Sequence, residues 1–553
     1  MVLSVAMSRT GAIKDLDIRP EDRTPLVEQL LGIISQLERK IEALEDEVSR
    51  LKGLPQKPRY GQPSTLEDPD GKPSTVDRRK KKKRKKRRRK RPGSAKRSKT
   101  AELIIHETIP LEIANLPEGS ERLGYKNYYV QDLKIQAHNT CYRRARYRLP
   151  DGRLLVAPLP DRIQGHFGNT LRSYLLYQHF HNHVTQPLLH EELTELGVDI
   201  SKGEINRLLT EGHEAFHAEK DELLPAARKV SEFLHTDDTG AKHRGKNGHT
   251  LHIGNQWFAA FFTTASKSRV NFLEVLQQPF EDYYIGAEAL EYMAHFKLPA
   301  YLLERIGKGL GEGDCWVVQG RANWDSQLEY WGVTSEEHRR IVTEAGLYGS
   351  LLEHELYDAM TLISDDAKQF KVLGFLHGLC WVHAERHVKR LVPTNTKERR
   401  AHDKVRDEIW TYYQKLKAYC EHPTQREKKR LDREFDRIFL QTTEYAELNE
   451  VLRTLHGKKA HLLLVLDHPE IPLHNNLSEN DIRQYVKKRK ISAGTRSDLG
   501  RRCRDTFLSL KTTCRKLSVS FWKYLQDRIN GFREIPPLPE LIQQQAMATT
   551  SRG

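Results

Sequence analysis

Three short stretches of the chain carry carboxylates in settings that suit a metal-dependent site. The apolar-alternating run VSEFLHTDDTG ends in Asp237 and Asp238, and the run MTLISDDAKQF ends in Asp365 and Asp366. A third acid, Glu479, lies near the predicted start of a helix in LHNNLSENDIRQYV. Two Mg²⁺ ions need carboxylate oxygens that converge from different elements, and strand ends and helix starts are places where such groups can meet. The pattern therefore predicts a site for two Mg²⁺ (or Mn²⁺) ions.

The stretch around Glu479 has a second interpretation. Asn476 is a plausible N-cap, and Asn-x-x-Glu is also the pattern of a capping box, in which the glutamate only closes the helix start. The two acidic sites upstream favour the metal interpretation, as does the dense set of cations that follows, because such a set suits phosphate. The cations that we expect to contact DNA here are Arg483, Lys487, Arg489 and Arg496.

The blocks, in this order, resemble a known family. HTDDTG followed by GKNGH, SDD followed by CWVHAERH, and HNNLSEN with KKRKISAGTRSD are similar to the three catalytic blocks of bacterial insertion-sequence transposases of the sixty-six family, transposase C type. The upstream stretches GYKNYYVQDLKIQ and RYRLPDGRLLVAPLPDRIQGHFGNTLRSYLL also resemble it, so that residues 102–530 are covered. By position, the resemblance places the family's acidic triad on Asp237, Asp365 and Glu479.

The sequence departs from the family pattern at three positions. Asp238 stands where the family usually has Glu, and Asp366 stands where it usually has Gly. Either aspartate of each pair could therefore be the metal ligand. His474 replaces an Asp that the family usually carries before the Asn pair.

The resemblance implies an α/β fold, namely a ribonuclease-H-like catalytic core with a largely α-helical insertion. We expect this domain at residues 227–535, with insertions near 275–360 and 395–460. The implied function is a DNA transposase that cleaves transposon ends and joins their 3′-hydroxyls to target DNA by two-metal phosphoryl transfer. Two alternatives remain: a catalytically inactive DNA-binding regulator or domesticated relative, and a metal nuclease of the same fold that cuts without joining.

A coiled coil is predicted at residues 24–53. Within 26–52 four heptads carry Val or Ile at each a position and Leu at each d position. β-Branched a residues with Leu at d favour a parallel two-stranded coil, so we expect a homodimer through these residues. The alternative is a core helix that packs within the same chain.

The segment 54–100 is rich in Pro, Ser, Lys and Arg, and we expect a disordered basic linker. Its block 78–91 consists of fourteen consecutive Lys and Arg, whereas the net charge of the whole chain is +16. The rest of the chain is therefore near neutral. The block, which includes Arg84 and Arg88, is expected to neutralise DNA phosphates without reading sequence.

Residues 101–160 contain alternating runs and a Pro-Asp-Gly turn, which predict a small β-rich domain. Residues 161–226 are predicted to be helical and to contain a helix-turn-helix-like DNA-binding region. Its second helix could present Lys202, Asn206 and Arg207 to a DNA groove. An ordinary helical hairpin is the alternative.

Other features bound the interpretation. Cys380, His383 and His387 share one helical face and could bind zinc, although packing is an alternative and no fourth ligand is evident. Six cysteines without a CxxC pair favour a reducing compartment. The sequence contains no apolar run long enough for a membrane span, and its N-terminus shows no pattern of a secretion signal. We therefore expect a cytoplasmic, nucleoid-associated bacterial protein without membrane partners. The tail 536–553 is expected to be disordered from Gln543 onward.

Overall fold

The computed structural model describes residues 104–550, with gaps at 114–118, 123, 161–162, 164, 309, 312–313 and 357–359. The chain divides into one unit that ends at Val130 and another that begins at Gln131. The predicted coil at 24–53 and the basic linker at 54–100, with Arg84 and Arg88, lie outside the described residues. Within the described residues, no helix combines the length and apolar character needed to cross a bilayer.

We predicted a small β-rich domain at residues 101–160, and the described residues of this region contain little strand. Its described strands are two short antiparallel ones, β1 (Arg146–Arg148) and β2 (Leu154–Val156). The alternating run YYVQDLKIQ belongs to no strand, and all of it is exposed. Alternation therefore did not suffice here, because a strand also needs a neighbour to pair with its backbone and to bury its apolar face.

Residues 169–228 are helical, as predicted. The elements are α2 (Asn169–Leu176), the π-helical turn η3 (Tyr177–His181), α3 (Gln186–Glu195), α4 (Lys202–Thr210), α5 (Glu214–Asp221) and α6 (Leu223–Arg228). The Ser201 hydroxyl caps α4 by accepting from the Glu204 amide at 3.1 Å. The apolar residues of α3 and α4 face each other in the core, which holds the two helices as a pair.

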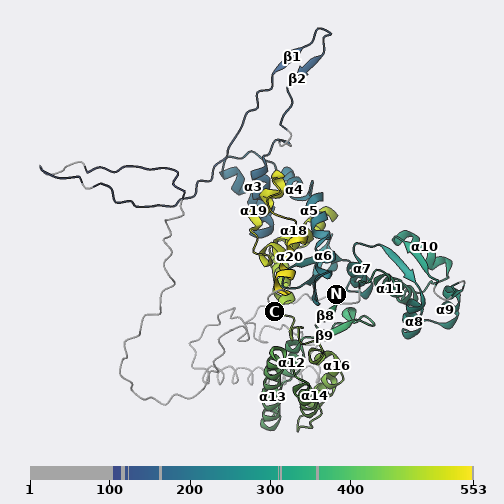
Figure 1. Ribbon diagram of the computed structural model, residues 1–553. Coiled ribbons are helices and arrows are strands. Elements are labelled where there is room, and N and C mark those ends of the chain that lie inside the picture. Colours follow the sequence, from purple (N-terminus) through teal and green to yellow (C-terminus); the bar gives the residue numbers. More distant parts are fainter. Residues whose placement is uncertain are drawn as a thin grey trace, which may run out of the picture. The chain divides into compact units, whose positions relative to one another are not determined.

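A five-stranded mixed sheet lies at the centre of the second unit (Figure 1). Its strands are β3 (Phe233–His243), β4 (Lys246–Gly254), β5 (Ala259–Thr264), β8 (Thr361–Ser364) and β9 (Leu376–Leu379). Their order is β5-β4-β3-β8-β9; β4 is antiparallel to both β5 and β3, whereas β8 runs parallel to β3 and β9 runs parallel to β8. This mixed α/β arrangement is consistent with a ribonuclease-H-like core.

One strand boundary differs from our prediction. The first acidic run does not end at Asp237, since β3 continues to His243 and pairs with β4 from His235 to His243. Gly245, with a φ of +78°, makes the tight connection between the two strands. Asp237 and Asp238 therefore lie within a strand, where successive side chains point to opposite faces of the sheet.

Helix α18 (Asp498–Lys516) covers the outer edge of β5. Asp505, Ser509 and Thr513, spaced by four residues along one helical face, accept hydrogen bonds from successive outward-facing amides of β5 at 2.7, 2.9 and 3.2 Å. The helix thus satisfies an edge that would otherwise expose unpaired backbone groups.

The first predicted insertion is a folded subdomain. It follows α7 (Arg269–Gln277) and contains β6 (Asp282–Ile285), α8 (Ala287–His295), α9 (Ala300–Gly307), β7 (Trp316–Gln319), α10 (Arg321–Tyr330) and α11 (Glu336–Glu353). Strands β6 and β7 pair with each other, and α11 packs closely on β6. The close approach requires Gly349, because a Cβ there would lie 2.1 Å from the Tyr284 carbonyl oxygen.

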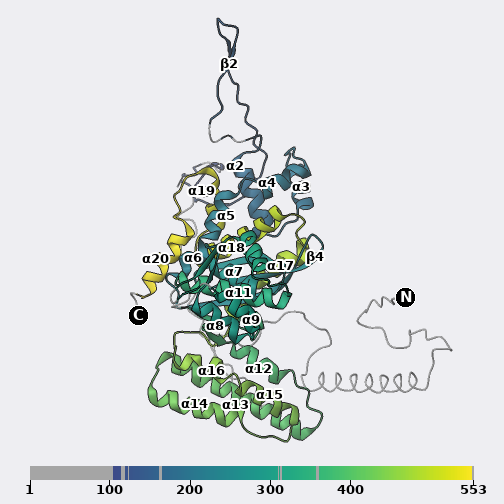
Figure 2. The same ribbon diagram turned by 90° about the vertical axis from the view of Figure 1, so that its right-hand side faces the viewer.

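The second insertion is α-helical, as predicted. After the 3₁₀ turn η4 (Lys368–Phe370) and β9 come α12 (Trp381–Lys389), α13 (Thr396–Glu421), α14 (Gln425–Phe439), α15 (Ala446–His456), α16 (Lys459–Leu462) and η5 (Leu464–Leu466). Figure 2 shows these helices side by side. Their aromatic core gathers Tyr412, Phe435 and Phe439 around the buried Trp381 ring.

The last described residues form helices, where we expected a disordered tail. After α17 (Asn476–Ser492) and α18 come α19 (Phe521–Asn530) and α20 (Leu538–Thr550). Leu538, Ile542 and Ala546 are buried, and α20 packs against α6. The prediction of disorder from Gln543 was wrong because an apolar stripe at four-residue spacing continues through a Gln- and Ala-rich segment.

Candidate active site

The start of α17 is attached to the central sheet by a buried asparagine. The Asn475 side chain is fully buried; its Oδ1 accepts from His235 Nδ1 at 2.8 Å and its Nδ2 donates to the Thr236 carbonyl at 2.9 Å. One turn later, Ser478 Oγ lies 2.6 Å from Nδ1 of the buried His252 on β4. Sequence reasoning chose Asn476 as the cap and missed this role of its neighbour.

The face of β3 that meets α17 is the face that carries Asp237. The side chains of residues 235, 237 and 239 point to one side of the strand, because successive side chains alternate between its two faces. His235 contacts Asn475, and Thr239 accepts from Arg489 Nη1 at 3.2 Å, so both ends of this row touch residues of the α17 segment. Glu479, in the first turn of α17, is therefore on the same side of the sheet as Asp237.

The three predicted acids are close enough to influence one another electrically. The pKa of Asp237 is raised to about 7, chiefly by burial and also by the negative charges of Asp365, Asp238 and Glu479, against a backbone hydrogen bond that lowers it. Asp365 follows β8 directly, as predicted, and β8 is the parallel neighbour of β3. A site in which several carboxylates are neighbours favours the binding of a cation.

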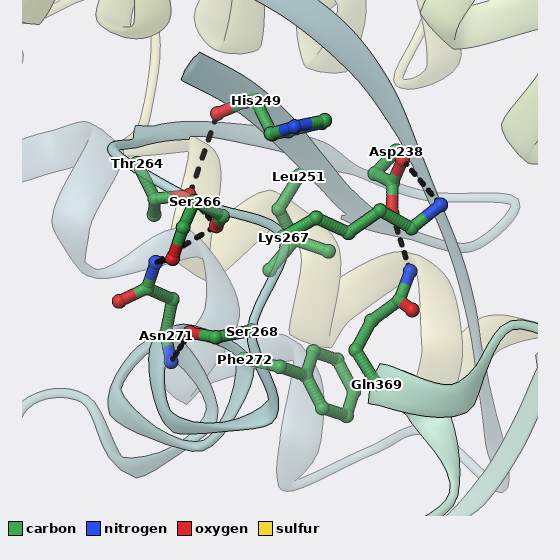
Figure 3. A pocket seen from close by; sticks show the side chains of 10 residues that line it. All are labelled: Asp238, His249, Leu251, Thr264, Ser266, Lys267, Ser268, Asn271, Phe272 and Gln369. Carbon is green, nitrogen blue, oxygen red and sulfur yellow. Dashed lines mark hydrogen bonds and ion pairs between the residues drawn. The ribbon is translucent and has the colours of Figure 1, made fainter. Parts of the chain in front are cut away.

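Asp238 lies on the opposite face of β3. Lys267 Nζ is 3.1 Å from Asp238 Oδ1, and Gln369 Nε2 donates to Asp238 Oδ2. Figure 3 shows these two side chains reaching Asp238 in a pocket beside the start of α7. The charge of Asp238 is thus already balanced by a lysine.

Asp366 is also balanced by lysines. Lys371 Nζ is 2.8 Å and Lys458 Nζ 2.5 Å from its carboxylate oxygens. Burial alone would raise the pKa of Asp366, but its bonds to the two lysines outweigh that effect and lower the pKa. Asp365 has no ion-pair partner among the described residues, and its Oδ1 accepts only from the Ala367 amide, at 3.1 Å.

Glu479 contacts cations of α12 and α17 rather than the helix backbone. Arg386 Nη2 is 3.3 Å from its Oε1, and Arg483 Nη2 is 3.6 Å from its Oε2. Among the described residues no side chain caps α17, so the capping-box interpretation finds no support. Arg386 was missed in the sequence, although it lies within the block CWVHAERH and one helical turn after His383.

The zinc interpretation also finds no support. The described residues contain no group of three His, Cys, Asp or Glu side chains placed to hold a metal ion, and this includes Cys380, His383 and His387. Cys380 instead accepts from the Asn475 amide at 3.2 Å. Burial and the adjacent Arg386 lower the pKa of His383, which favours its neutral form.

Asp237, Asp365 and Glu479 lie near one another, but among the described residues they too are not close enough together to hold a metal ion. Their donor chemistry nevertheless fits Mg²⁺, which prefers carboxylate oxygens over nitrogen or sulfur. Oε1 of Glu479 is buried and accepts no hydrogen bond within the described part of the chain, so it can serve as a ligand. The donor set therefore suits a divalent cation, provided that the side chains draw together around it.

The predicted DNA-contacting residues on α4 are exposed, and two of them contact other side chains of the protein. Arg207 forms an ion pair with Glu204, with 2.5 Å between Arg207 Nη2 and Glu204 Oε1, and Asn206 Oδ1 accepts from Gln186 at 3.1 Å. Lys202 is exposed at the first position of the helix.

The predicted cations of the α17 segment fall into two groups. Arg483, Lys487 and Arg496 are exposed, and Arg489 is half-buried against Thr239. The neighbouring Lys488 is fully buried and donates to the His179 carbonyl of η3 at 2.6 Å. A run of four cations in the sequence thus divides by helical face into external and internal residues.

Fold and site together define a mixed α/β protein in which two neighbouring strands and one helix bring three carboxylates near one another. Residues 335–502 match the family described as Transposase IS66 family. The chain is also 39% identical over 330 residues to "Uncharacterized protein y4jO" of Sinorhizobium fredii (strain NBRC 101917 / NGR234), covering 59% of this chain and 100% of that protein. The chain belongs to the IS66 family of transposases.

Proposed function

We propose that the protein cleaves DNA at transposon ends and joins the resulting 3′-hydroxyls to target DNA, with Asp237, Asp365 and Glu479 as the catalytic carboxylates. One observation carries the assignment. The charges of Asp365 and Glu479 act on the Asp237 carboxyl, so the three acids lie near one another, whereas lysines balance Asp238 and Asp366. The unbalanced acid of each pair is the better candidate ligand, since a bound cation would relieve the mutual repulsion.

Each side chain has a role in this proposal. Two Mg²⁺ or Mn²⁺ ions held by the three carboxylates would activate the attacking oxygen and stabilise the leaving oxygen at phosphorus. Arg386 holds the Glu479 carboxylate toward α12. Asn475 sets the start of α17 against β3, so that Glu479 is positioned by a buried contact rather than by a mobile loop.

Exposed cations would position the DNA. Arg483, Lys487, Arg489 and Arg496 follow Glu479 in the sequence and would hold phosphates for in-line displacement. The α4 residues Lys202, Asn206 and Arg207 would contact a groove, and Arg84 and Arg88 with the rest of the basic block would bind phosphates of any sequence.

The test is the replacement Glu479→Gln, with Glu450→Gln on the exposed face of α15 as the matched control. If Glu479 is a ligand, the variant should fold and bind DNA but neither cleave nor join ends, and Mg²⁺ should raise the Tm of the wild type but not that of the variant. If Glu479 only closes a helix, joining should persist near the wild-type rate, and this result would remove the main support for the proposal. Cleavage without joining in the wild type would indicate a nuclease instead.

We also propose that residues 26–52 form a parallel dimer. The change Ile34→Lys with Ile41→Lys places charges in two successive a layers of the predicted coil and should produce monomers. Light scattering measures the mass directly, and an unchanged mass would contradict the proposed coil.

A further inference from the structure

The β1–β2 hairpin is a basic ribbon to which no role has been assigned. Residues 143–153 contain five arginines, Arg143, Arg144, Arg146, Arg148 and Arg153, and one acid, Asp151. Asp151 is already paired with Arg153, with 2.5 Å between Oδ2 and Nε. All five arginines are exposed, so the ribbon presents a concentrated positive charge to solvent.

The pairing of the strands arranges part of this charge on one face. Arg146 lies opposite Val156 and Arg148 opposite Leu154, whereas Tyr147 lies opposite Leu155. Directly paired residues of an antiparallel ribbon share a face, and successive residues alternate. Arg146 and Arg148 therefore project from the same side, about 6.8 Å apart along the strand.

The ribbon also lacks a core of its own. Tyr147, Leu154 and Leu155 are 64%, 58% and 55% exposed, although their side chains are apolar or aromatic. An isolated two-stranded hairpin is marginally stable in water and needs a further surface to hold it. Exposed apolar groups beside arginines indicate that this surface is supplied by a partner with negative charge.

We propose that the β1–β2 hairpin binds double-stranded DNA as a ribbon in the major groove, with the face of Arg146 and Arg148 toward the duplex. The major groove is wide enough for a two-stranded ribbon. The spacing of about 6.8 Å between the two arginines corresponds to two steps of about 3.4 Å along a DNA strand. The proposal deepens the proposed function by naming a further DNA contact, but it does not depend on the catalytic carboxylates.

The first test measures binding of the full chain to a duplex as a function of salt, without Mg²⁺. Each phosphate contact contributes about −0.9 to the slope of log Kobs against log[salt], so Arg146→Gln with Arg148→Gln should make the slope shallower by about 1.8. Arg146→Lys with Arg148→Lys should restore the slope, because charge is retained. The matched control, Arg399→Gln with Arg400→Gln, removes two exposed arginines of α13 and should leave the slope unchanged.

Several results would overturn the proposal. These are a slope unaffected by the glutamine changes, an equal effect of the α13 control, or failure of the lysine pair to restore binding. None of them bears on catalysis, which the Glu479→Gln experiment tests separately. The two proposals can therefore fail independently.

A second test needs no substitution. Trypsin cleaves after Arg146, Arg148 and Arg153, and mass spectrometry can follow these cuts in the wild-type chain. Duplex DNA should protect the three sites more than single-stranded DNA or RNA of the same length. Protection that is equal with single strands, or that rises with protein concentration in the absence of DNA, would overturn the proposal and indicate RNA or a second copy of the chain as the partner.

Discussion

Replacing Asn475 with leucine tests whether the buried link between α17 and β3 positions the proposed site. The substitution keeps the branching and the number of heavy atoms but removes both hydrogen bonds of the side chain. Because Nδ2 donates to the Thr236 carbonyl, Oδ1 accepts, and His235 must carry its proton on Nδ1. Burial lowers the pKa of His235 to about 3, so this histidine is neutral at physiological pH and the bond is between neutral groups.

The expected loss of stability follows from the two groups that lose a hydrogen-bond partner. His235 is 2% exposed and Thr236 is fully buried, so water cannot replace either bond. An orphaned buried donor or acceptor costs about 1–3 kcal/mol, which gives about 2–6 kcal/mol for the pair. At roughly 2 °C or more per kcal/mol for a large domain, Tm should fall by at least about 4 °C. Joining should fall with it, since Glu479 lies in the turn that Asn475 holds in place.

The neighbouring residue provides the control. Asn476 is half-buried and its side chain forms no hydrogen bond within the described residues, so Asn476→Leu should change stability by only about 0.5 kcal/mol. Differential scanning fluorimetry and a strand-joining assay measure the two effects. The reasoning is refuted if both variants lose the same Tm, or if Asn475→Leu retains full joining activity.

Two further outcomes are expected. Burial, with Arg504 and Lys511 nearby, lowers the pKa of Lys488 to about 7, so the folded state releases this proton while the unfolded chain keeps it. Stability should therefore rise by about 2 kcal/mol between pH 7 and 9, and Tm of Lys488→Met should rise less than that of the exposed Lys490→Met; parallel pH profiles would contradict this. Asp365→Asn should abolish joining with little change in Tm, whereas Asp366→Asn should lower Tm and retain joining; the reverse result in the same two assays would exchange the proposed ligand.

The order and local setting of the acidic blocks could be predicted from the sequence. Asp365 follows a short apolar run and Glu479 follows a helix start, and both settings depend on residues only a few positions away. Local patterns also predicted the helices of α3 and α4 with the Ser201 cap, and the α-helical character of the second insertion. Such features are readable because hydrophobic period and capping act over one or two turns.

Only the tertiary structure distinguished the members of each aspartate pair. Adjacent strand residues point to opposite faces, but the sequence does not say which face a distant helix will cover. Asp237 lies on the face of α17, and Asp238 lies with Lys267 of the loop before α7. Lys458, which balances Asp366, comes from a separate insertion.

The same reason explains the errors and omissions. Arg386 and Glu479 meet only because α12 and α17 converge, and Lys488 is buried only because η3 packs against its face of α17. Conversely, the run YYVQDLKIQ alternates like a strand but has no neighbouring strand to pair with. Short-range chemistry determined which elements could form, whereas pairing, burial and charge compensation between distant segments determined which side chains share a site.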